Sequence, residues 1–314
     1  MKVVCVTGCL GFMGSYFTRA CLQKGWRVWG IDLNTYAANR QHLDEFARYE
    51  TFKFTEGDIA DLTHLYEVSH IFNFAAETHV DNSIMHSDTF LHSNVIGMQN
   101  LLELIRRRSN YEMPALIHLS TDEVYGDCDR GKNPEQAPLT PSNPYSASKA
   151  AADMLLLAWS RTYGIPFNIV RPTNNYGIGQ YPEKLIPKAV KCLSLGKKIP
   201  LHAGGTPVRN WLHVEDTVNA IFCVIERGER GKIYNVAGNY EAPNLDVVSK
   251  ILQCYFGKPV KTEDYVDLAH ERRGGDMRYA LDDAAVRALG FKNEKVFDDE
   301  LAKIVEHCKQ TFVW

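Results

Sequence analysis

A glycine-rich turn directly after the first apolar segment constrains this chain more than any other feature. Residues Val3 to Val6 form a short run typical of a buried strand, and Gly8, Gly11 and Gly14 follow where a helix is expected to begin. In that context Gly8 permits the tight turn, Gly11 lets the backbone approach a pyrophosphate, and Gly14 allows close helix packing. The helix N-terminus adds N–H donors for the anion. We therefore expect a dinucleotide site at this turn.

Alternating strand and helix patterns predict an α/β fold. The expected strands are short apolar runs: Val3 to Val6, Arg27 to Ile31, Thr51 to Phe54, His70 to Phe74, Leu116 to Leu119 and Phe167 to Val170. Helical patterns over 89–108 and 146–163 are long enough to return the chain in parallel. We expect a Rossmann-type doubly wound parallel sheet over 1–173, carrying the cofactor and the catalytic residues. A smaller, interleaved C-terminal α/β substrate domain is expected over 174–314, because the rhythm changes after about Asn174.

Charge and cysteine usage exclude several classes of protein. The formal net charge is -3, from 38 acidic and 35 basic residues, so no general basic field exists for nucleic acid or an anionic membrane. The eight cysteines are scattered without a CxxC pair, which is typical of reduced thiols in the cytoplasm. No long uncharged run predicts a membrane span. His79, His86 and His92 have no metal-site spacing, and we expect no metal.

Two aspartates after predicted strands are candidates for contacts to the adenosine half of a cofactor. Asp32 ends the second strand, where a carboxylate can accept hydrogen bonds from both ribose hydroxyls and would repel a 2′-phosphate. This position favours NAD over NADP. The alternative is a helix cap or a surface aspartate. Asp58, followed by Ile59, could contact the adenine edge by the same logic, although an aspartate in a turn is common.

A second group of polar residues predicts acid–base chemistry. Thr121, Asp122 and Glu123 follow the strand that ends at Leu119, at the sheet edge where ligands bind. Tyr145 and Lys149 are four residues apart and share one helix face. A nearby ammonium and a positively charged nicotinamide ring would favour the phenolate, which could take a proton while the substrate carbon gives hydride to NAD. Isolated YxxxK patterns are frequent by chance, and the acidic pair could instead cap a turn.

Eight segments in order carry a resemblance to a known family. The chain resembles the extended short-chain dehydrogenase/reductase superfamily and, within it, the dTDP-glucose 4,6-dehydratases, over nearly its whole length. The matching segments are TGCLGFMGS (7–15), DLNTYAAN (32–39), FAAETHVDNSI (74–84), STDEVYGD (120–127), NPYSASKAAAD (143–153), NNYGIGQYPEKLIP (174–187), RNWLHVED (209–216) and RYALD (278–282).

This resemblance implies a set of site residues. The cofactor NAD would be held by Gly8, Gly11, Phe12, Met13, Gly14, Asp32, Asn34, Asp58, Ile59, Phe74, Ala75, Ala76, Tyr145 and Lys149. A nucleotide-diphosphate sugar would be held by His79, Thr121, Asn174, Glu183, Lys184, Leu185, Arg209, Asn244 and Arg272, with the two arginines and Asn244 at the diphosphate.

The resemblance also implies a reaction. Tyr145 and NAD would oxidise C4 of the hexose, which acidifies the C5 proton. Glu123 would take that proton and Asp122 would protonate the departing C6 hydroxyl, after which hydride returns to C6. Thr121 would bind the C4 oxygen, and Lys149 the nicotinamide ribose. The acidic pair favours dehydration over the alternatives, an NAD-dependent nucleotide-sugar epimerase or decarboxylase, or a non-catalytic dinucleotide-binding scaffold.

One stretch departs from the family pattern. The family usually reads Arg-Pro-Gly-His-Asp where this chain reads RRGGD over 272–276, so the histidine is missing and an arginine is added. The nucleotide therefore stays open between dTDP, UDP and another base, as do the hexose and its C2 substituent. In the family, helices matching 89–108 and 146–163 pair across a dimer axis. We expect a homodimer by analogy, the alternative being that their apolar residues are core.

Overall fold

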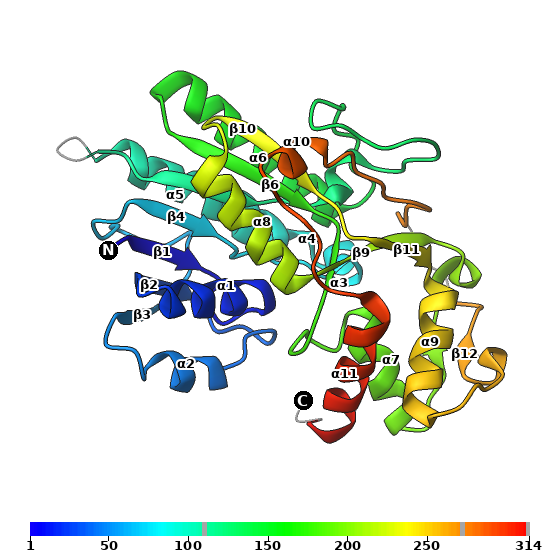
Figure 1. Ribbon diagram of the computed structural model, residues 1–314. Helices are drawn as coiled ribbons and strands as arrows, with labels where there is room; N and C mark the ends of the chain where they lie inside the picture. Colours follow the sequence, from blue (N-terminus) through cyan, green and yellow to red (C-terminus); the bar gives the residue numbers. More distant parts are fainter. Residues whose placement is uncertain (109–111, 271–273, 312–314) are drawn as a thin grey trace.

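Seven parallel strands form the main sheet, in the order β10-β6-β5-β4-β1-β2-β3 (Figure 1). The computed structural model describes residues 1–108, 112–270 and 274–311. The strands are β1 (Val3–Thr7), β2 (Arg27–Asp32), β3 (Phe52–Glu56), β4 (His70–Asn73), β5 (Ala115–Leu119), β6 (Phe167–Pro172) and β10 (Lys232–Val236). The order reverses between β1 and β4, so crossovers run in both directions from β1. The predicted doubly wound parallel sheet is confirmed.

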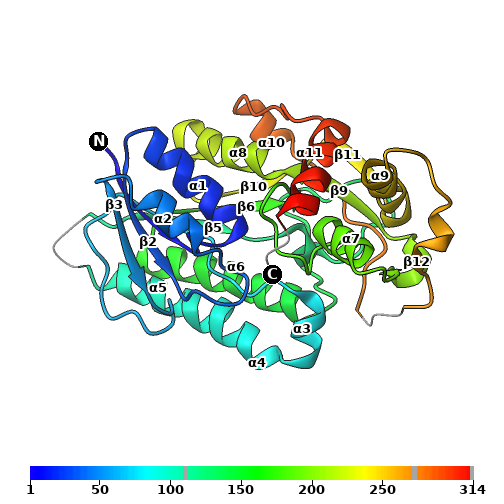
Figure 2. The ribbon, with the colours of Figure 1, turned by 90° about the horizontal axis from the view of Figure 1, so that it is seen from below.

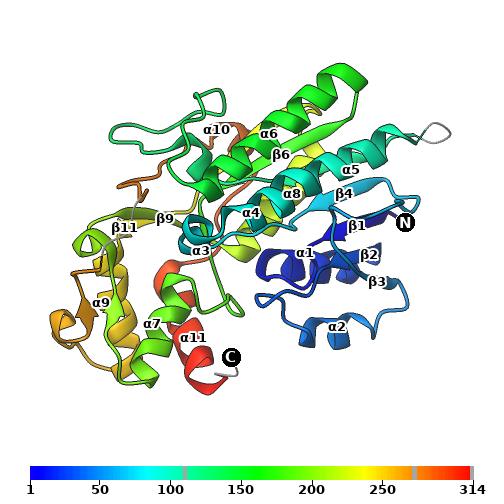
Figure 3. The same ribbon diagram turned by 180° about the vertical axis from the view of Figure 1, so that it is seen from behind.

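Helices cover both faces of this sheet (Figures 2 and 3). One face carries α1 (Phe12–Gln23) and α8 (Val214–Arg227), and the other carries α5 (Gly97–Arg106) and α6 (Pro144–Tyr163). In β1, Val4 and Val6 pack in the cluster on the α1 side, whereas Cys5 packs in the cluster on the α5 side. Burial on both faces explains why the strands are apolar runs without alternation.

Shorter helices complete the Rossmann part and its loops. They are α2 (Gln41–Phe46), α3 (Val80–Met85), α4 (Ser87–Phe90), the π-helical turn η1 (Leu91–Ile96), the 3-10 turn η2 (Asp122–Tyr125) and α10 (Ala284–Ala288). None of the helices within the described residues is long and apolar enough to cross a membrane.

The C-terminal part has a smaller core of its own. A three-stranded sheet of β11 (Tyr240–Pro243), β9 (Val208–His213) and β7 (Asn174–Tyr176) lies beside α7 (Leu185–Ser194), α9 (Asn244–Phe256) and α11 (Phe297–Gln310). The remaining elements are β8 (Ile199–Pro200), β12 (Val266–Asp267), η3 (His202–Gly205) and η4 (Thr262–Asp264). Trp211, Ile251 and Phe297 are buried together in this second core.

Two elements differ from the sequence prediction. The seventh strand, β10, comes from beyond residue 174 and pairs with β6, so the two parts interleave. The helix expected over 89–108 begins at Ser87 and contains the π-helical turn. Asn94, inside that turn, accepts a hydrogen bond from the backbone N–H of Glu77 and donates one to its carbonyl oxygen. A regular helical pattern carries no signal for such an insertion.

Candidate active site

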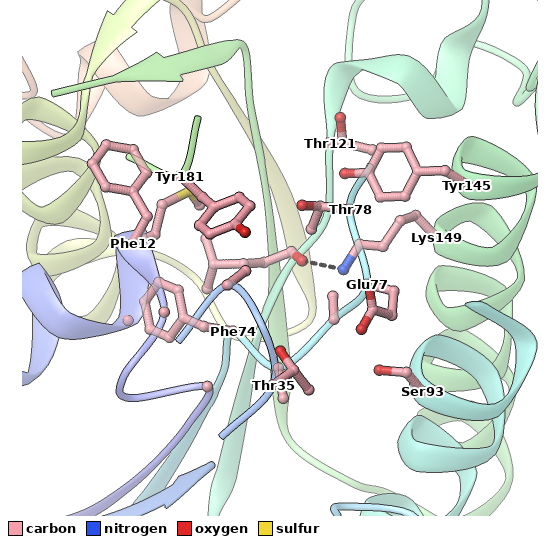
Figure 4. Close-up of a pocket in the computed structure, with 18 of the residues that line it drawn as sticks. Phe12, Thr35, Phe74, Glu77, Thr78, Ser93, Thr121, Tyr145, Lys149 and Tyr181 are labelled. Carbon is pink, nitrogen blue, oxygen red and sulfur yellow. Dashed lines mark hydrogen bonds between the residues drawn. The ribbon is translucent and has the colours of Figure 1, made fainter. Parts of the chain in front are cut away.

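A cavity of about 740 Å³ opens at the carboxyl ends of the main strands, where the strand order reverses. Its volume lies in the usual range for a ligand cavity, and its position is the switch point at which open α/β sheets bind ligands. In Figure 4, Phe12, Phe74 and Tyr181 lie on one side of the cavity, and Tyr145 and Lys149 extend into it from α6 on the other. The nucleotide turn and the acid–base residues therefore share one cavity.

The glycine turn leaves no room for side chains. Gly8 has a φ of +68°, and a Cβ placed on it would lie 2.7 Å from the backbone nitrogen of Ala75. A Cβ on Gly14 would lie 2.0 Å from the carbonyl oxygen of Gly8. The bare backbone of Gly8 and Gly11 lines the cavity at the start of α1, with Phe12 and Met13 beside it. This cradle and the adjacent helix N-terminus fit the pyrophosphate of NAD.

Asp32 lies buried beside the turn and lines the cavity. Its two carboxylate oxygens accept hydrogen bonds from the backbone N–H groups of Leu10, at 2.9 Å, and Asn34, at 2.8 Å. Burial raises the pKa of Asp32, and these backbone donors act in the opposite direction. The contacts fix the carboxylate between the glycine turn and the loop after β2. Asn34 itself has a φ of 56° and is not among the described residues that line the cavity.

The other predicted cofactor residues cluster around these two features. The structure brings Asp58, Ile59, Phe74, Ala75 and Ala76 to the cavity wall. Asp58 accepts a hydrogen bond from the backbone N–H of Ala60 at 2.8 Å, which orients its carboxylate at the end of the β3 loop.

Thr121 and Asp122 begin the 3-10 turn after β5. The Thr121 hydroxyl accepts a hydrogen bond from the Glu123 backbone N–H at 3.2 Å and donates one to Asp122 Oδ1 at 3.1 Å. Asp122 is buried, and burial together with the negative charge of Glu123 raises its pKa to about 8. Arg209 and the Thr121 hydroxyl act in the opposite direction. Asp122 therefore holds a proton at neutral pH and can act as an acid.

Tyr145 and Lys149 are set by the start of α6. Asn143 caps the helix by accepting from the Ser146 backbone N–H at 2.9 Å, and Pro144 occupies the first turn. Burial raises the pKa of Tyr145, as does the negative charge of Glu123, while a hydrogen bond with Thr121 lowers it. Lys149 donates to the carbonyl oxygen of Leu119 at 2.6 Å, the bond dashed in Figure 4. Burial lowers its pKa to about 8.

Two contacts to Glu123 were not predicted from the sequence. The Tyr279 hydroxyl lies 3.4 Å from Glu123 Oε2 and donates to Asp276 Oδ2 at 2.7 Å. Asn143 Nδ2 donates to the same Glu123 oxygen at 3.4 Å. The RYALD segment carried the signal for Tyr279, but its 156-residue separation from Glu123 hides the contact in the sequence. The C-terminal part thus reaches the acidic pair.

The predicted substrate residues divide into two groups. Asn174, Glu183 and Lys184 line the cavity, and Lys184 donates to the carbonyl oxygen of Thr78 at 2.9 Å. Of the described residues, four with predicted substrate contacts do not line it: His79, Leu185, Arg209 and Asn244. Arg272 lies outside the described residues.

Arg209 has a different environment from the one predicted. Its guanidinium donates to the carbonyl oxygens of Val208 at 2.8 Å and Asp276 at 2.9 Å, and it stacks 4.4 Å from the ring centroid of Tyr279. The side chain is buried, and these carbonyl oxygens accept from two of its guanidinium nitrogens. In this structure Arg209 supports the segment that carries Tyr279.

One group of possible metal ligands occurs within the described ranges. Potential ligand atoms of Asp58, Asp61 and His92 lie within 4.8 Å of one another. Asp61 and His92 are exposed, and exposed acidic groups commonly gather without an ion. We assign no metal to this group.

The fold and the cavity define a class: a dinucleotide-binding α/β enzyme with a tyrosine, a lysine and an acidic pair at the sheet edge. The profile of the GDP-mannose 4,6 dehydratase family matches residues 5–304. The dTDP-glucose 4,6-dehydratase of Haemophilus influenzae is 38% identical over 329 residues, covering 98% of this chain and 97% of that protein. The low-salt glycan biosynthesis protein Agl12 of Haloferax volcanii is 38% identical over 309 residues, covering 97% of each chain.

A solved structure agrees with these sequence relatives. The dTDP-glucose 4,6-dehydratase from Streptomyces venezuelae, with NAD and TYD bound, superimposes with a TM-score of 0.92 at 38% identity, covering 98% of this chain and 97% of that one. The chain therefore belongs to the GDP-mannose 4,6 dehydratase family and is an NAD-dependent nucleotide-sugar 4,6-dehydratase, a lyase.

Proposed function

We propose that this enzyme converts an NDP-hexose, dTDP-glucose or a close analogue, to the NDP-4-keto-6-deoxyhexose. The observation that carries the proposal is the pairing of the buried Asp122 with the less buried Glu123 on the wall of the cavity that holds Tyr145. The raised pKa of Asp122 supports an acid role for it. An acid and a base side by side are what an elimination across C5 and C6 requires. Relatives that are 38–39% identical over nearly the whole chain and bear the dTDP-glucose 4,6-dehydratase name support the choice of nucleotide.

The residues divide the work in this proposal. When bound, NAD accepts hydride from C4 and later returns it to C6. Lys149 and the positively charged ring of bound NAD would favour the phenolate of Tyr145 against the effect of burial. The phenolate would take the proton from the C4 hydroxyl, and Thr121, which is hydrogen-bonded to Tyr145, would orient that oxygen. Glu123 takes the C5 proton, and Asp122 gives its proton to the departing C6 hydroxyl. Lys149 provides the positive charge beside Tyr145 and holds the nicotinamide ribose.

We also propose which residues contact the substrate. Asn174, Glu183 and Lys184 line the cavity and would hold the sugar or its diphosphate. Arg209, Asn244 and Arg272, all in the C-terminal part, would contact the diphosphate, and His79 and Leu185 would contact the substrate elsewhere. We propose that this part, from 174 on, forms the substrate domain, with β10 and α8 contributed to the 1–173 cofactor domain.

We further propose a homodimer that works in the cytoplasm. Met85, Leu91, Ile96 and Met154 are exposed apolar side chains on helices of one outer face, here called the apolar helix face. Figure 3 shows α4, α5 and α6 side by side on this face. A second copy would cover it across a two-fold axis. All eight cysteines are free thiols, which agrees with a reducing compartment.

Incubation with nucleotide sugars tests the proposed function. The purified enzyme is given dTDP-glucose, UDP-glucose and their N-acetyl analogues, and each product is weighed by mass spectrometry. Loss of one water from dTDP-glucose is the expected result. Epimerised or decarboxylated product without loss of water would favour the alternative enzymes, and no product from any sugar would favour a non-catalytic scaffold.

A further inference from the structure

A chain of buried polar side chains runs beneath the cavity, from the glycine turn toward α6. The Ala75 backbone N–H, on the cavity wall, donates to the Thr7 hydroxyl at 3.3 Å, and that hydroxyl donates to Asn73 Oδ1 at 2.6 Å. The Asn73 amide nitrogen lies 3.2 Å from His118 Nδ1. Thr7, Asn73 and His118 are all buried. None of the three side chains has a role in the proposed chemistry.

The order of donors in this chain fixes the state of His118. Because Asn73 uses its oxygen to accept from Thr7, its N–H group faces His118 Nδ1, which must therefore accept. Burial and the positive charges of Lys149 and Arg171 lower the pKa of His118, so the ring is neutral and carries its proton on Nε2. That atom lies 3.5 Å from Asp153 Oδ1, and neither atom has a hydrogen-bond partner within the described residues.

Asp153 is the last residue of this series of buried polar side chains, and it carries the only negative charge in the series. Its Oδ2 accepts from the Ser120 hydroxyl at 3.0 Å and from Arg171, through Nε at 3.0 Å and Nη2 at 2.9 Å. The side chain is completely buried. Arg171 is held in turn by the Tyr125 hydroxyl at 2.6 Å and the Glu135 carbonyl oxygen at 3.3 Å. The carboxylate is therefore held by Ser120, directly after β5, and by Arg171 on β6, and the loop beyond η2 in turn holds Arg171.

Lys149 lies one helical turn before Asp153, on the same face of α6. Burial lowers the pKa of Lys149, and Asp153 is the group whose charge raises it again. The charged or titratable groups facing Asp153 are Lys149 on α6, Arg171 on β6 and His118 on β5. Because His118 is neutral, the Asp153 carboxylate compensates the positive charges of two buried residues, Lys149 and Arg171.

We infer that Asp153 is a positioning residue: its carboxylate, fixed by Arg171 and Ser120, is the counter-charge that keeps the Lys149 ammonium charged in the cavity that also holds Tyr145. This inference rests on the role proposed for Lys149. It assigns a function to the last residue of the NPYSASKAAAD segment, which the proposed chemistry does not otherwise use. An ordinary structural ion pair between Asp153 and Arg171 is the competing explanation.

The test is the titration of Lys149 itself, followed by NMR through its ε-carbon in ¹³C-lysine-labelled protein without substrate. The resonance is assigned by its loss in Lys149→Met. In Asp153→Asn we expect the pKa of Lys149 to fall by about one unit or more. The alkaline limb of single-turnover C4 oxidation should move to lower pH by a similar amount. Asp153→Glu, which restores the charge, should recover part of both shifts.

Control variants separate this inference from a loss of stability. Asp216→Asn changes another buried aspartate, whose carboxylate accepts from the Glu294 and Lys295 backbone N–H groups, and should leave the Lys149 titration unchanged. If Asp153→Asn does not fold because Arg171 is left unpaired, the double variant Asp153→Asn with Arg171→Gln removes both charges. A downward shift is still expected there, because Asp153 raises the pKa of Lys149. The shift should be smaller than in Asp153→Asn, because loss of the positive charge of Arg171 acts in the opposite direction.

An unchanged Lys149 titration in a folded Asp153 variant would overturn the inference. The NMR experiment needs no turnover, so it can fail while the wild-type enzyme dehydrates its substrate. Conversely, a wild-type enzyme that dehydrates none of the sugars would refute the proposed function and leave the titration as an independent result.

Discussion

Asp122 and Glu123 are neighbours in the sequence, yet the fold gives them different surroundings. Asp122 is buried behind Thr121, which donates to its carboxyl group. Glu123 is only partly buried and contacts the Tyr279 hydroxyl and the Asn143 amide. Two carboxyls in separated environments can divide an acid role from a base role. The sequence placed both at the sheet edge, but their surroundings depend on residues far along the chain.

Asp122→Asn should slow dehydration by about 10²- to 10⁴-fold, because the departing hydroxyl loses its proton donor. Oxidation at C4 should survive, so reduced cofactor should accumulate in a single turnover, followed by absorbance. In the wild type, dehydration should decline as pH rises through about 8, where Asp122 ionises. A variant that dehydrates at the wild-type rate would contradict the acid role.

The same substitution has a stability consequence with a definite sign. The folded-state pKa of Asp122, about 8, lies above its ordinary value of 3.8, so the native state holds a proton that the unfolded state releases between those values. Burying this carboxyl therefore costs more stability as pH rises. Asp122→Asn should raise Tm, and the gain should be larger at pH 8 than at pH 5. A gain that does not grow with pH would argue against the raised pKa.

Tyr279→Phe should slow exchange of the C5 proton with solvent by up to about tenfold, because Glu123 loses a hydroxyl whose single hydrogen is shared with Asp276, worth at most about 1.5 kcal/mol. Deuterium incorporation at C5 in heavy water measures it. Tyr240→Phe is the matched control, because Tyr240 stacks on Phe297 in the second core. Equal exchange rates in both variants would show that the Tyr279 hydroxyl does not influence proton removal by Glu123.

At the scale of elements, the sequence predicted six of the strands in the main sheet to within two residues at each end. Uninterrupted apolar runs and glycine turns are strong local signals. The π-helical turn and the edge strand β10 were missed for one reason. Both depend on distant partners, namely Glu77 for Asn94 and β6 for β10.

The glycine turn gives the sharpest prediction at this scale. Gly14→Ala puts a Cβ 2.0 Å from the carbonyl oxygen of Gly8, so the start of α1 must move away from the turn. We expect affinity for NAD to fall at least about tenfold, measured by calorimetry on cofactor-free protein. Gly25→Ala, just past the end of the same helix, meets nothing within 4 Å and has a φ of +72°.

That control should cost about 1 kcal/mol of stability through backbone strain, with NAD affinity unchanged. If Gly25→Ala weakens NAD binding as much as Gly14→Ala does, the loss reflects general destabilisation and not the turn.

At the scale of the whole molecule, the active site is built from both parts of the chain. The Rossmann part contributes the acidic pair and α6. The C-terminal part contributes Tyr279, which stacks against Arg209. The sequence predicted the interleaving, and the diphosphate contact of Arg209 stays a prediction. The motif does not reveal that carbonyl oxygens of Val208 and Asp276 also accept hydrogen bonds from this arginine.

The apolar helix face gives a prediction about assembly. Met154 on α6 is 48% exposed, and Met154→Glu should convert a dimer to a monomer in light scattering, because a buried, unpaired charge would oppose association. Leu195→Glu changes an apolar residue that is 58% exposed, at the end of α7 in the C-terminal part. It should leave the dimer intact. A monomeric wild type, or a dimer that survives Met154→Glu, would contradict this interface.

The central claim is that oxidation at C4 and reduction at C6 occur within one substrate molecule in one cavity. The direct measurement uses dTDP-glucose carrying deuterium at C4, with the product examined by NMR and mass spectrometry. We expect a 4-keto-6-deoxy product that has lost one water and carries the deuterium at C6. Deuterium retained at C4, or lost to solvent with no label at C6, would contradict it.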